Sequence, residues 1–212
     1  MPRILKSVSL SLLLLPLLLL ALGSYEREAK RLADLMNWKP GQVIAEIGAG
    51  EGQMSFFAAQ TVGADGHIYT TELDDKKLDN LKKEVKQRNL GNVTVVKADP
   101  IQTNLPDDCC DAVFMRRVYH HFTDPTATDA SLLRALKPGG LLAVIDFAPH
   151  AGLPPVQNAP HNHGGHGIEK NTLITELTSA GFEIVAQPKD WPNHGDGDYC
   201  VIARKPAAPK PS

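Results

Sequence analysis

The sequence predicts an α/β fold: a doubly wound, mainly parallel β-sheet with helices on both faces. Short apolar runs, beginning with Val43–Ile47, alternate along the chain with segments whose apolar residues keep helical spacing. The first run leads into a turn with three glycines, Gly48–Gly52, as in doubly wound folds that bind nucleotides. A hydrophobic content of 42% is ordinary for a globular protein, and 212 residues provide one such domain.

Apolar spacing and turn signals place the remaining elements in order. Strands are expected at 67–75, 93–97, 111–117, 141–147, 182–187 and 198–205. Helices are expected over Glu51–Val62, from a cap at Asp74 or Asp75 to near Gly91, over Pro125–Leu136, and over Thr172–Ala180. Asn171 is the expected cap of the last helix and Gly181 its stop, while Lys137-Pro138-Gly139 is expected to close the helix before it.

The glycine turn predicts a bound nucleoside. Gly48, Gly50 and Gly52 offer a backbone that a ligand can approach closely, because glycine has no Cβ and accepts positive φ angles. Twenty residues further on, the second strand ends at Glu72, and a carboxylate at that place can accept both hydroxyls of a ribose.

Two classes of cofactor fit this arrangement to different degrees. A dinucleotide fingerprint requires a small residue where this chain has Gln53, and here the third glycine comes one position early. Glu46, two residues before Gly48, suits a ligand that carries a cation, such as the ammonium and sulfonium of S-adenosylmethionine. The stretch resembles motif I of class I S-adenosylmethionine-dependent methyltransferases.

The resemblance covers roughly residues 40 to 204. The stretch VVKADP ends near Asp99, where the family places an acid close to the adenine. Residues 111–122 are similar to the family's fourth strand and the turn that follows it. LKPGG (136–140) is similar to the family's turn into strand five. It implies a seven-stranded sheet whose last strand is antiparallel, and S-adenosylmethionine as the cofactor. The cofactor-binding residues that we expect from the motifs are Glu46, Gly48, Ala49, Gly50, Gly52, Glu72, Leu73, Asp99, Pro100 and Arg116.

The methyl acceptor is expected to meet the residues that follow the fourth strand. Tyr119, His120 and His121 are the candidate catalytic residues, because an imidazole can orient a nucleophile or take its proton near neutral pH. The alternative is that His121 only packs or shapes the pocket. RRVYHHF departs from the Asn/Asp-Pro-Pro-aromatic motif that accompanies adenine or glutamine methylation, so a small-molecule acceptor is favoured.

The segment Ala148–Glu169 contains no convincing helix or strand and leaves the fifth strand beside the acceptor side. Loops of this length are usually functional or disordered, so a substrate lid is predicted. His150, His161, His163 and His166 raise the question of a metal. H-x-H-x-x-H on a loop without accompanying acids is not a formed site, so no metal is expected there.

Two other functions stay open: a nucleotide-dependent oxidoreductase of the NAD type, which Gln53 disfavours, and a non-catalytic S-adenosylmethionine-binding protein. The formal net charge is −2, and no cluster of basic residues runs along one face, so no nucleic-acid partner is predicted. The sequence does not indicate an oligomeric state.

The N-terminus has the pattern of a signal peptide or membrane anchor. Arg3 and Lys6 precede the apolar run Val8–Leu22, and small residues follow it. The domain boundaries predicted from this are 1–24 for the segment, 25–204 for the methyltransferase domain and 205–212 for a disordered tail. The protein is therefore expected to be exported or anchored in a membrane.

In a host that recognises the N-terminal segment as a signal peptide or membrane anchor, the protein should leave the cytosol or sediment with membranes. Fractionation followed by N-terminal sequencing checks this expectation. An intact Met1 on a soluble cytosolic protein would contradict it.

Overall fold

The computed structural model describes residues 25–189, 191–192 and 197–207. The predicted signal or anchor segment, 1–24, lies outside the described residues, as do residues 208–212 of the predicted tail. Within the described ranges, no helix has both the length and the apolar character needed to cross a bilayer.

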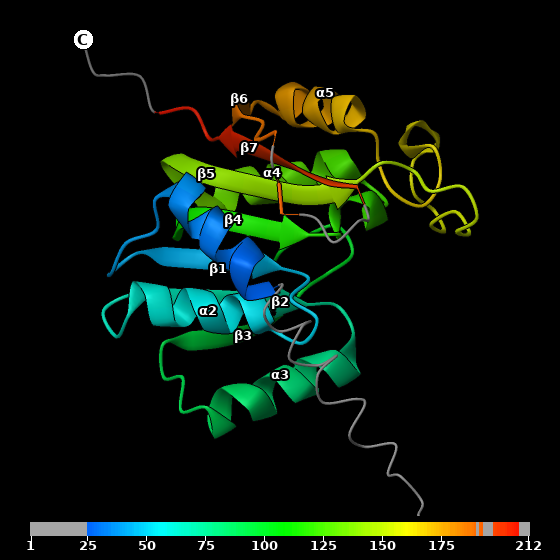
Figure 1. Ribbon diagram of the computed structural model, residues 1–212. Helices are drawn as coiled ribbons and strands as arrows, with labels where there is room; N and C mark the ends of the chain where they lie inside the picture. The colour runs from blue at the N-terminus through cyan, green and yellow to red at the C-terminus, as the bar shows by residue number, and fades with distance from the viewer. Residues whose placement is uncertain (1–24, 190, 193–196, 208–212) are drawn as a thin grey trace, which may run out of the picture.

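Seven strands form one sheet in the order β3-β2-β1-β4-β5-β7-β6 (Figure 1). Their bounds are β1 Val43–Ile47, β2 His67–Glu72, β3 Val93–Lys97, β4 Cys110–Arg116, β5 Leu136–Phe147, β6 Glu183–Ala186 and β7 Asp198–Arg204. β7 runs antiparallel to β5 and β6, and the pairs from β3 to β5 are parallel. The predicted sheet, including its antiparallel last strand, is confirmed.

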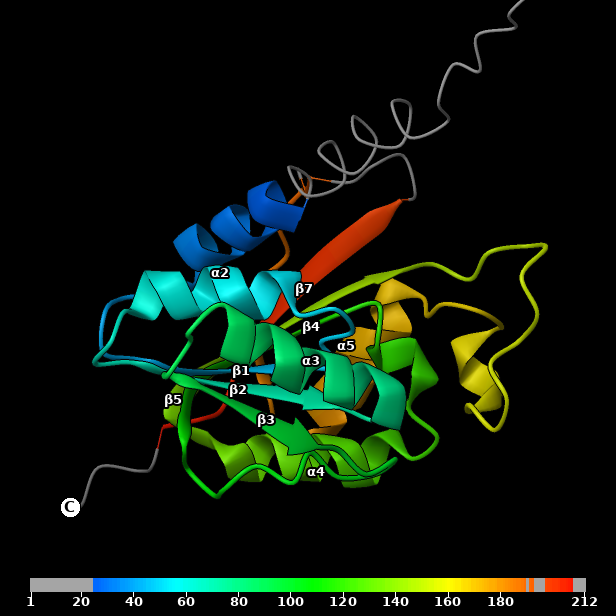
Figure 2. The same cartoon turned by 90° about the horizontal axis from the view of Figure 1, so that it is seen from below.

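Helices cover both faces of the sheet (Figure 2). One face carries a helix over residues 25–36, α2 (Gln53–Val62) and α3 (Asp75–Gln87). The other carries α4 (Pro125–Ala135) and α5 (Lys170–Ala180). The sheet is therefore buried on both sides, which explains why its inner strands read as nearly continuous apolar runs.

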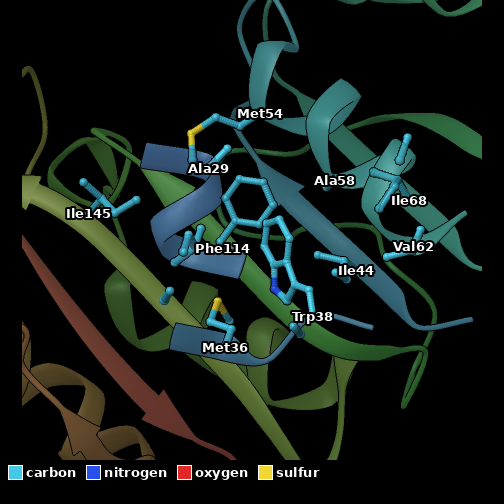
Figure 3. Close-up of a cluster of buried hydrophobic side chains, with 14 of the residues drawn as sticks. Ala29, Met36, Trp38, Ile44, Met54, Ala58, Val62, Ile68, Phe114 and Ile145 are labelled. Carbon is cyan, nitrogen blue, oxygen red and sulfur yellow. The ribbon is translucent and has the colours of Figure 1, made fainter. Parts of the chain in front are cut away.

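The helix over residues 25–36, which the sequence pattern did not indicate, closes the core of the first face (Figure 3). Its Ala29, Leu32 and Met36 pack with Trp38 against the strands, and the Trp38 ring lies 5.3 Å from that of Phe114. Fully burying a large apolar side chain contributes about 1.5–3 kcal/mol, so this helix is part of the folded domain.

Several element boundaries differ from those expected; α2 begins at Gln53 and not at Glu51, and α3 ends at Gln87, before Gly91. Asp74 caps α3 as predicted, accepting a hydrogen bond from Lys77 N at 2.9 Å. Asn171, however, lies inside α5, which begins at Lys170 after Glu169, so the predicted cap is wrong. Glu169 occupies the N-cap position with an extended backbone and no side-chain cap hydrogen bond, and the helix begins directly after it.

The Lys137–Gly140 stretch belongs to β5, where the prediction placed a turn. A register irregularity between Cys110 and Ala112 absorbs it. Gly139 N and Gly140 O both pair with the backbone of Lys205. Lys205, the first residue of the predicted tail, is therefore paired with the backbone of β5.

The parallel strands end at one edge of the sheet, and this edge positions the site. Ile47 of β1 pairs with Met115 of β4, and Glu46 lies beside both Phe114 and Thr70. The segment 148–169 leaves β5 at the same edge, beyond the arrowheads of the strands (Figures 1 and 2). Ligands of doubly wound sheets bind outside this edge.

Candidate functional site

The three glycines of the turn after β1 have different tasks. A Cβ on Gly48 would lie 2.6 Å from Val118 Cγ2, and one on Gly52 would lie 2.6 Å from Leu81 Cδ2. These two glycines therefore let neighbouring side chains pack against the turn. Gly50, at φ 57°, has no atom within 4 Å of a built Cβ, so its backbone borders open space in which a ligand fits.

Glu72, at the end of β2, holds the glycine turn in place. Its carboxylate accepts backbone N–H bonds from Gly50 at 2.9 Å, Leu73 at 2.7 Å and Asp74 at 2.9 Å. A carboxylate has about four acceptor positions, so roughly one is left for a ligand. The predicted bonds to both ribose hydroxyls would therefore require one of these backbone bonds to be given up.

Glu46 is a buried carboxyl directly before the turn. It is 4% exposed, and Ser55 of α2 donates its hydroxyl hydrogen to Oε2. Burial raises the pKa of Glu46 to about 7, although the Ser55 hydrogen bond and the positive charge of Arg116 act in the opposite direction. A cation placed beside this carboxyl would stabilise its ionised form, which suits the predicted cofactor.

Arg116 is engaged by the protein itself. Its Nε lies 2.7 Å from Glu28 Oε2, its Nη2 lies 3.6 Å from Asp198 Oδ2, and its guanidinium lies 5.0 Å from the ring centroid of Tyr25. Through these contacts Arg116 ties the helix over residues 25–36 to the end of β4. Its predicted contact with the cofactor stays a prediction.

A cavity of about 160 Å³ brings several predicted residues together. It is lined by Ile47, Gly48, Leu73, Ala98, Asp99, Pro100, Gln102, Thr103, Val118, His121, Phe122, Thr123 and Thr128. Asp99 is held in a tight turn, because its Oδ1 accepts a hydrogen bond from Ile101 N at 3.2 Å. Ala49 is not among the residues that line this cavity, and its backbone N–H donates to Thr71 O at 2.9 Å. The cavity is apolar apart from a few polar groups, as nucleoside sites are.

His120 is fixed by Asp146 at the acceptor side of this edge. Its Nδ1 lies 2.7 Å from Asp146 Oδ1, and its backbone N–H donates to Oδ2 at 3.2 Å. An ionised carboxylate only accepts, so Nδ1 carries the hydrogen and Nε2 presents a lone pair. This Nε2 is buried without a hydrogen-bond partner among the described residues.

His121 and Tyr119 flank His120 but face different surroundings. His121 lines the cavity, and desolvation, followed by the neighbouring ring of His120, lowers the pKa of His121 to about 4. Tyr119 is fully buried under α4, where its hydroxyl donates to Asp129 Oδ2 at 2.9 Å. Burial raises the pKa of Tyr119, and its placement speaks against the predicted catalytic part.

The histidines of the 148–169 segment are not gathered in one place. His163 is buried and its Nε2 lies 3.2 Å from Glu176 Oε2, which anchors the segment to α5. His166 lies beside His120, with ring centroids 5.1 Å apart. His150 and His161 are exposed. Removing His161–His166 to test the lid would therefore also remove a buried anchor.

Two residues of the site escape sequence reasoning. Ser55 is one of several small residues in α2, and only its place one turn into the helix after Glu46 could have suggested a contact. His166 comes from a segment without periodicity, so nothing in the pattern pairs it with His120. Asp146 carries a weak signal, since an acid that ends an apolar strand of a parallel sheet lies at the ligand-binding edge.

Comparison with known proteins supports this geometry. A family model described as "Methyltransferase domain" matches residues 45–144. The ubiquinone/menaquinone biosynthesis C-methyltransferase UbiE of Vibrio parahaemolyticus is 30% identical over 128 residues, which are 59% of this chain and 49% of that protein. The arsenite methyltransferase of Halobacterium salinarum is 29% identical over 186 residues, 79% of this chain and 48% of that protein. The chain thus spans about half the length of these curated relatives.

Solved structures agree on the fold. A crystal structure of an S-adenosylmethionine-dependent methyltransferase from Aquifex aeolicus superposes with a TM-score of 0.67 at 21% identity, covering 83% of this chain and 87% of that one. The sheet order, the glycine turn, the buried acid before it and the matched family model point to the same cofactor, S-adenosylmethionine. The matched methyltransferase domain, the curated relatives and the shared fold together support the class I S-adenosylmethionine-dependent methyltransferases as the family of this chain.

Proposed function

We propose that the protein transfers the methyl group of S-adenosylmethionine to a small-molecule acceptor that enters beside His120 and His121. The observation that carries the proposal is the shared edge of β1, β2 and β4. There the open backbone at Gly50 and the buried Glu46 flank Gly48, which lines the same cavity as Leu73, Asp99 and His121. A cofactor bound in the cavity would thus have potential acceptor-binding groups within the same site.

The residues present fit the cofactor. In this proposal Glu46 holds its cationic end, the backbone at Gly50 borders it, and the remaining acceptor position of Glu72 binds a ribose hydroxyl. Leu73, Asp99 and Pro100 line the part of the cavity that suits an adenine. S-adenosylmethionine supplies a methyl group on a sulfonium, already a good leaving group, so alignment and desolvation can provide most of the acceleration.

His120 is proposed to act on the acceptor. Asp146 holds the ring with Nε2 presented as a lone pair, and this atom is buried and without a partner among the described residues. Such a group can bind or deprotonate an acceptor hydroxyl, thiol or amine. His121 would shape the wall between the acceptor and the cofactor.

Two observations bear on the acceptor: the names of the relatives bear on its size, and the anchoring of the segment after β5 bears on how it would be covered. The two relatives compared above are named for C-methylation in ubiquinone/menaquinone biosynthesis and for the methylation of arsenite, and from these names we infer a small acceptor. The segment after β5 is anchored at His163 and Ile168, which leaves its exposed stretch 151–155 as the proposed lid. A non-catalytic cofactor-binding protein remains the alternative, and turnover separates the two.

Gly50→Val is expected to abolish methyl transfer and cofactor binding. A β-branched side chain would fill the open space beside the turn and oppose the positive φ. Transfer is measured with isotopically labelled S-adenosylmethionine and a metabolite extract, with product mass as the readout. Gly41→Val is the matched control, because Gly41 has a φ of 84°, equally open surroundings and a place at the opposite end of β1. Equal activity in both variants would contradict the proposed cofactor position.

Glu72→Ala is expected to weaken S-adenosylhomocysteine binding at least about tenfold, since a charged acceptor is worth about 1.5–3 kcal/mol per hydrogen bond. It should also lower the melting temperature, because three backbone N–H groups lose their acceptor. Isothermal titration and thermal unfolding measure the two effects. Glu51→Ala, which removes an exposed acid of the same turn, should change neither. Parental affinity in folded Glu72→Ala would reduce Glu72 to a structural residue.

The affinity for S-adenosylhomocysteine should rise about eightfold between pH 6 and pH 7.5. A ligand ammonium favours the ionised Glu46, whose pKa of about 7 in the free protein leaves it mostly protonated at pH 6. For the free protein the sign is opposite: the raised pKa contributes stability below about pH 4.5, and this is lost as the pH rises through 7.

Titration calorimetry at several pH values checks this dependence. Glu46→Gln should bind more weakly and with a flat pH profile, while Glu51→Gln should keep the profile of the parent. A profile that Glu46→Gln leaves unchanged would assign the proton to another group.

A further inference from the structure

Three imidazoles from two distant segments meet beside the cofactor cavity. His120 and His121 follow β4, and His166 comes from the segment after β5; one potential ligand atom of each lies within 4.8 Å of those of the other two. The ring centroids of His120 and His121 are 4.1 Å apart. We propose that these three histidines bind one divalent transition-metal ion, with Zn²⁺ the best-fitting ion, and leave one position for the methyl acceptor.

His120 has the environment of a metal ligand. Its Nδ1 lies 2.7 Å from Asp146 Oδ1, which fixes both the tautomer and the ring plane. Asp146 is itself fully buried and held by the backbone N–H groups of His120 and Phe147. The lone pair of His120 Nε2 is left inside the protein with no partner among the described residues, although His120 is only 1% exposed. Buried polar atoms are rarely unsatisfied, so this atom indicates a missing ligand.

His166 is oriented in the same way by a different group. Its Nδ1 lies 3.0 Å from the carbonyl oxygen of Pro154. A carbonyl can only accept, so Nδ1 carries the hydrogen and Nε2 presents its lone pair. The backbone bond from His150 N to His166 O, 3.0 Å long, closes the loop that carries this ring. Two of the three histidines thus have the outer-shell partner that metal-binding imidazoles usually have.

The spacing requires only small adjustments. Ligand nitrogens about 2.1 Å from a tetrahedral zinc ion lie about 3.4 Å from one another. Nitrogens within 4.8 Å reach this spacing by side-chain rotation at His121, on the rim, and His166, on the loop. His120, fixed by Asp146, would remain in place.

The donor set identifies the class of ion. Three imidazoles without a thiolate or a direct carboxylate suit zinc and its first-row neighbours and disfavour Mg²⁺ or Ca²⁺, which require oxygen ligands. Three protein ligands also leave an open position, as in catalytic zinc sites. The H-x-H-x-x-H pattern of the 148–169 segment, in which no metal was expected, contributes only His166 to this cluster. The other two ligands, His120 and His121, precede β5 in the sequence.

The role of the ion rests on the proposed function, and in the metal-bound protein the ion takes over the part given there to His120 Nε2, because this lone pair would then hold the ion and could not accept a proton from the acceptor. A hydroxyl or thiol of the acceptor that binds the open position would lose its proton to solvent more readily, because the ion stabilises the anion. The acceptor would then face the cofactor cavity as a nucleophile, since His121 lines both sites. Acceptors with an ionisable oxygen or sulfur are therefore the favoured class.

The experiment titrates Zn²⁺ into the chelator-treated full chain, purified without a histidine tag. Calorimetry should give one ion per chain with micromolar affinity or better, and Co²⁺ should give the visible absorption of a tetrahedral site. His166→Ala should weaken Zn²⁺ binding at least about tenfold. It should leave S-adenosylhomocysteine affinity within about twofold, because His166 does not line the cofactor cavity.

His161→Ala is the matched control, since His161 is an exposed histidine of the same segment and should leave Zn²⁺ binding unchanged. The absence of a saturable site, or equal Zn²⁺ affinity in His166→Ala and the parent, would overturn the proposal. If Zn²⁺ binds with this dependence while no acceptor is ever methylated, the metal site stands and the proposed function falls.

Discussion

The site depends on the confinement of β1. This strand pairs in parallel with β2 on one edge and β4 on the other, and helices cover both of its faces. The sheet therefore uses most backbone groups of the strand, although Val43 N donates to Asp111 Oδ2 at 2.8 Å, and the side chains of Ile44 and Ala45 are fully buried. Groups of this strand that are free to bind a ligand can therefore lie only at its end, and the neighbouring parallel strands end at the same edge. The buried Glu46, the glycine turn and the histidine pair follow from that one constraint.

Two carboxylates, those of Glu72 and Asp146, fix the geometry of this edge by hydrogen bonding. Glu72 gathers the N–H groups of Gly50, Leu73 and Asp74, and so connects the ends of β1 and β2. Asp146 gathers the backbone and ring of His120, and so connects the ends of β4 and β5. In the proposed function, one carboxylate preorganises the cofactor side and the other the acceptor side. Each has its acceptor positions largely filled by protein, which makes both costly to remove.

Glu46 and the histidine cluster share a second property: both are polar groups that the free protein accommodates incompletely. Burial leaves Glu46 partly protonated near neutral pH, and the lone pair of His120 Nε2 has no partner among the described residues. Ligands with positive charge would satisfy both groups. A cofactor cation at Glu46 and a metal ion at His120 would thus be bound partly because they relieve unfavourable burial.

The sequence by itself determined the α/β sheet and, through the family resemblance, its antiparallel last strand and the cofactor, because apolar periodicity and glycine spacing are local properties. Gly48, Leu73, Asp99, Pro100 and His121, which it predicted as site residues, line one cavity, and their roles stay predictions. The sequence did not reveal the helix over residues 25–36 in the core, the burial of Tyr119, or the engagement of Arg116 by Glu28. Nor could it pair His166 with His120, which are 46 positions apart in the numbering. Only the tertiary structure decided these, because contacts between distant segments depend on how the strands and loops pack, and no local pattern records that.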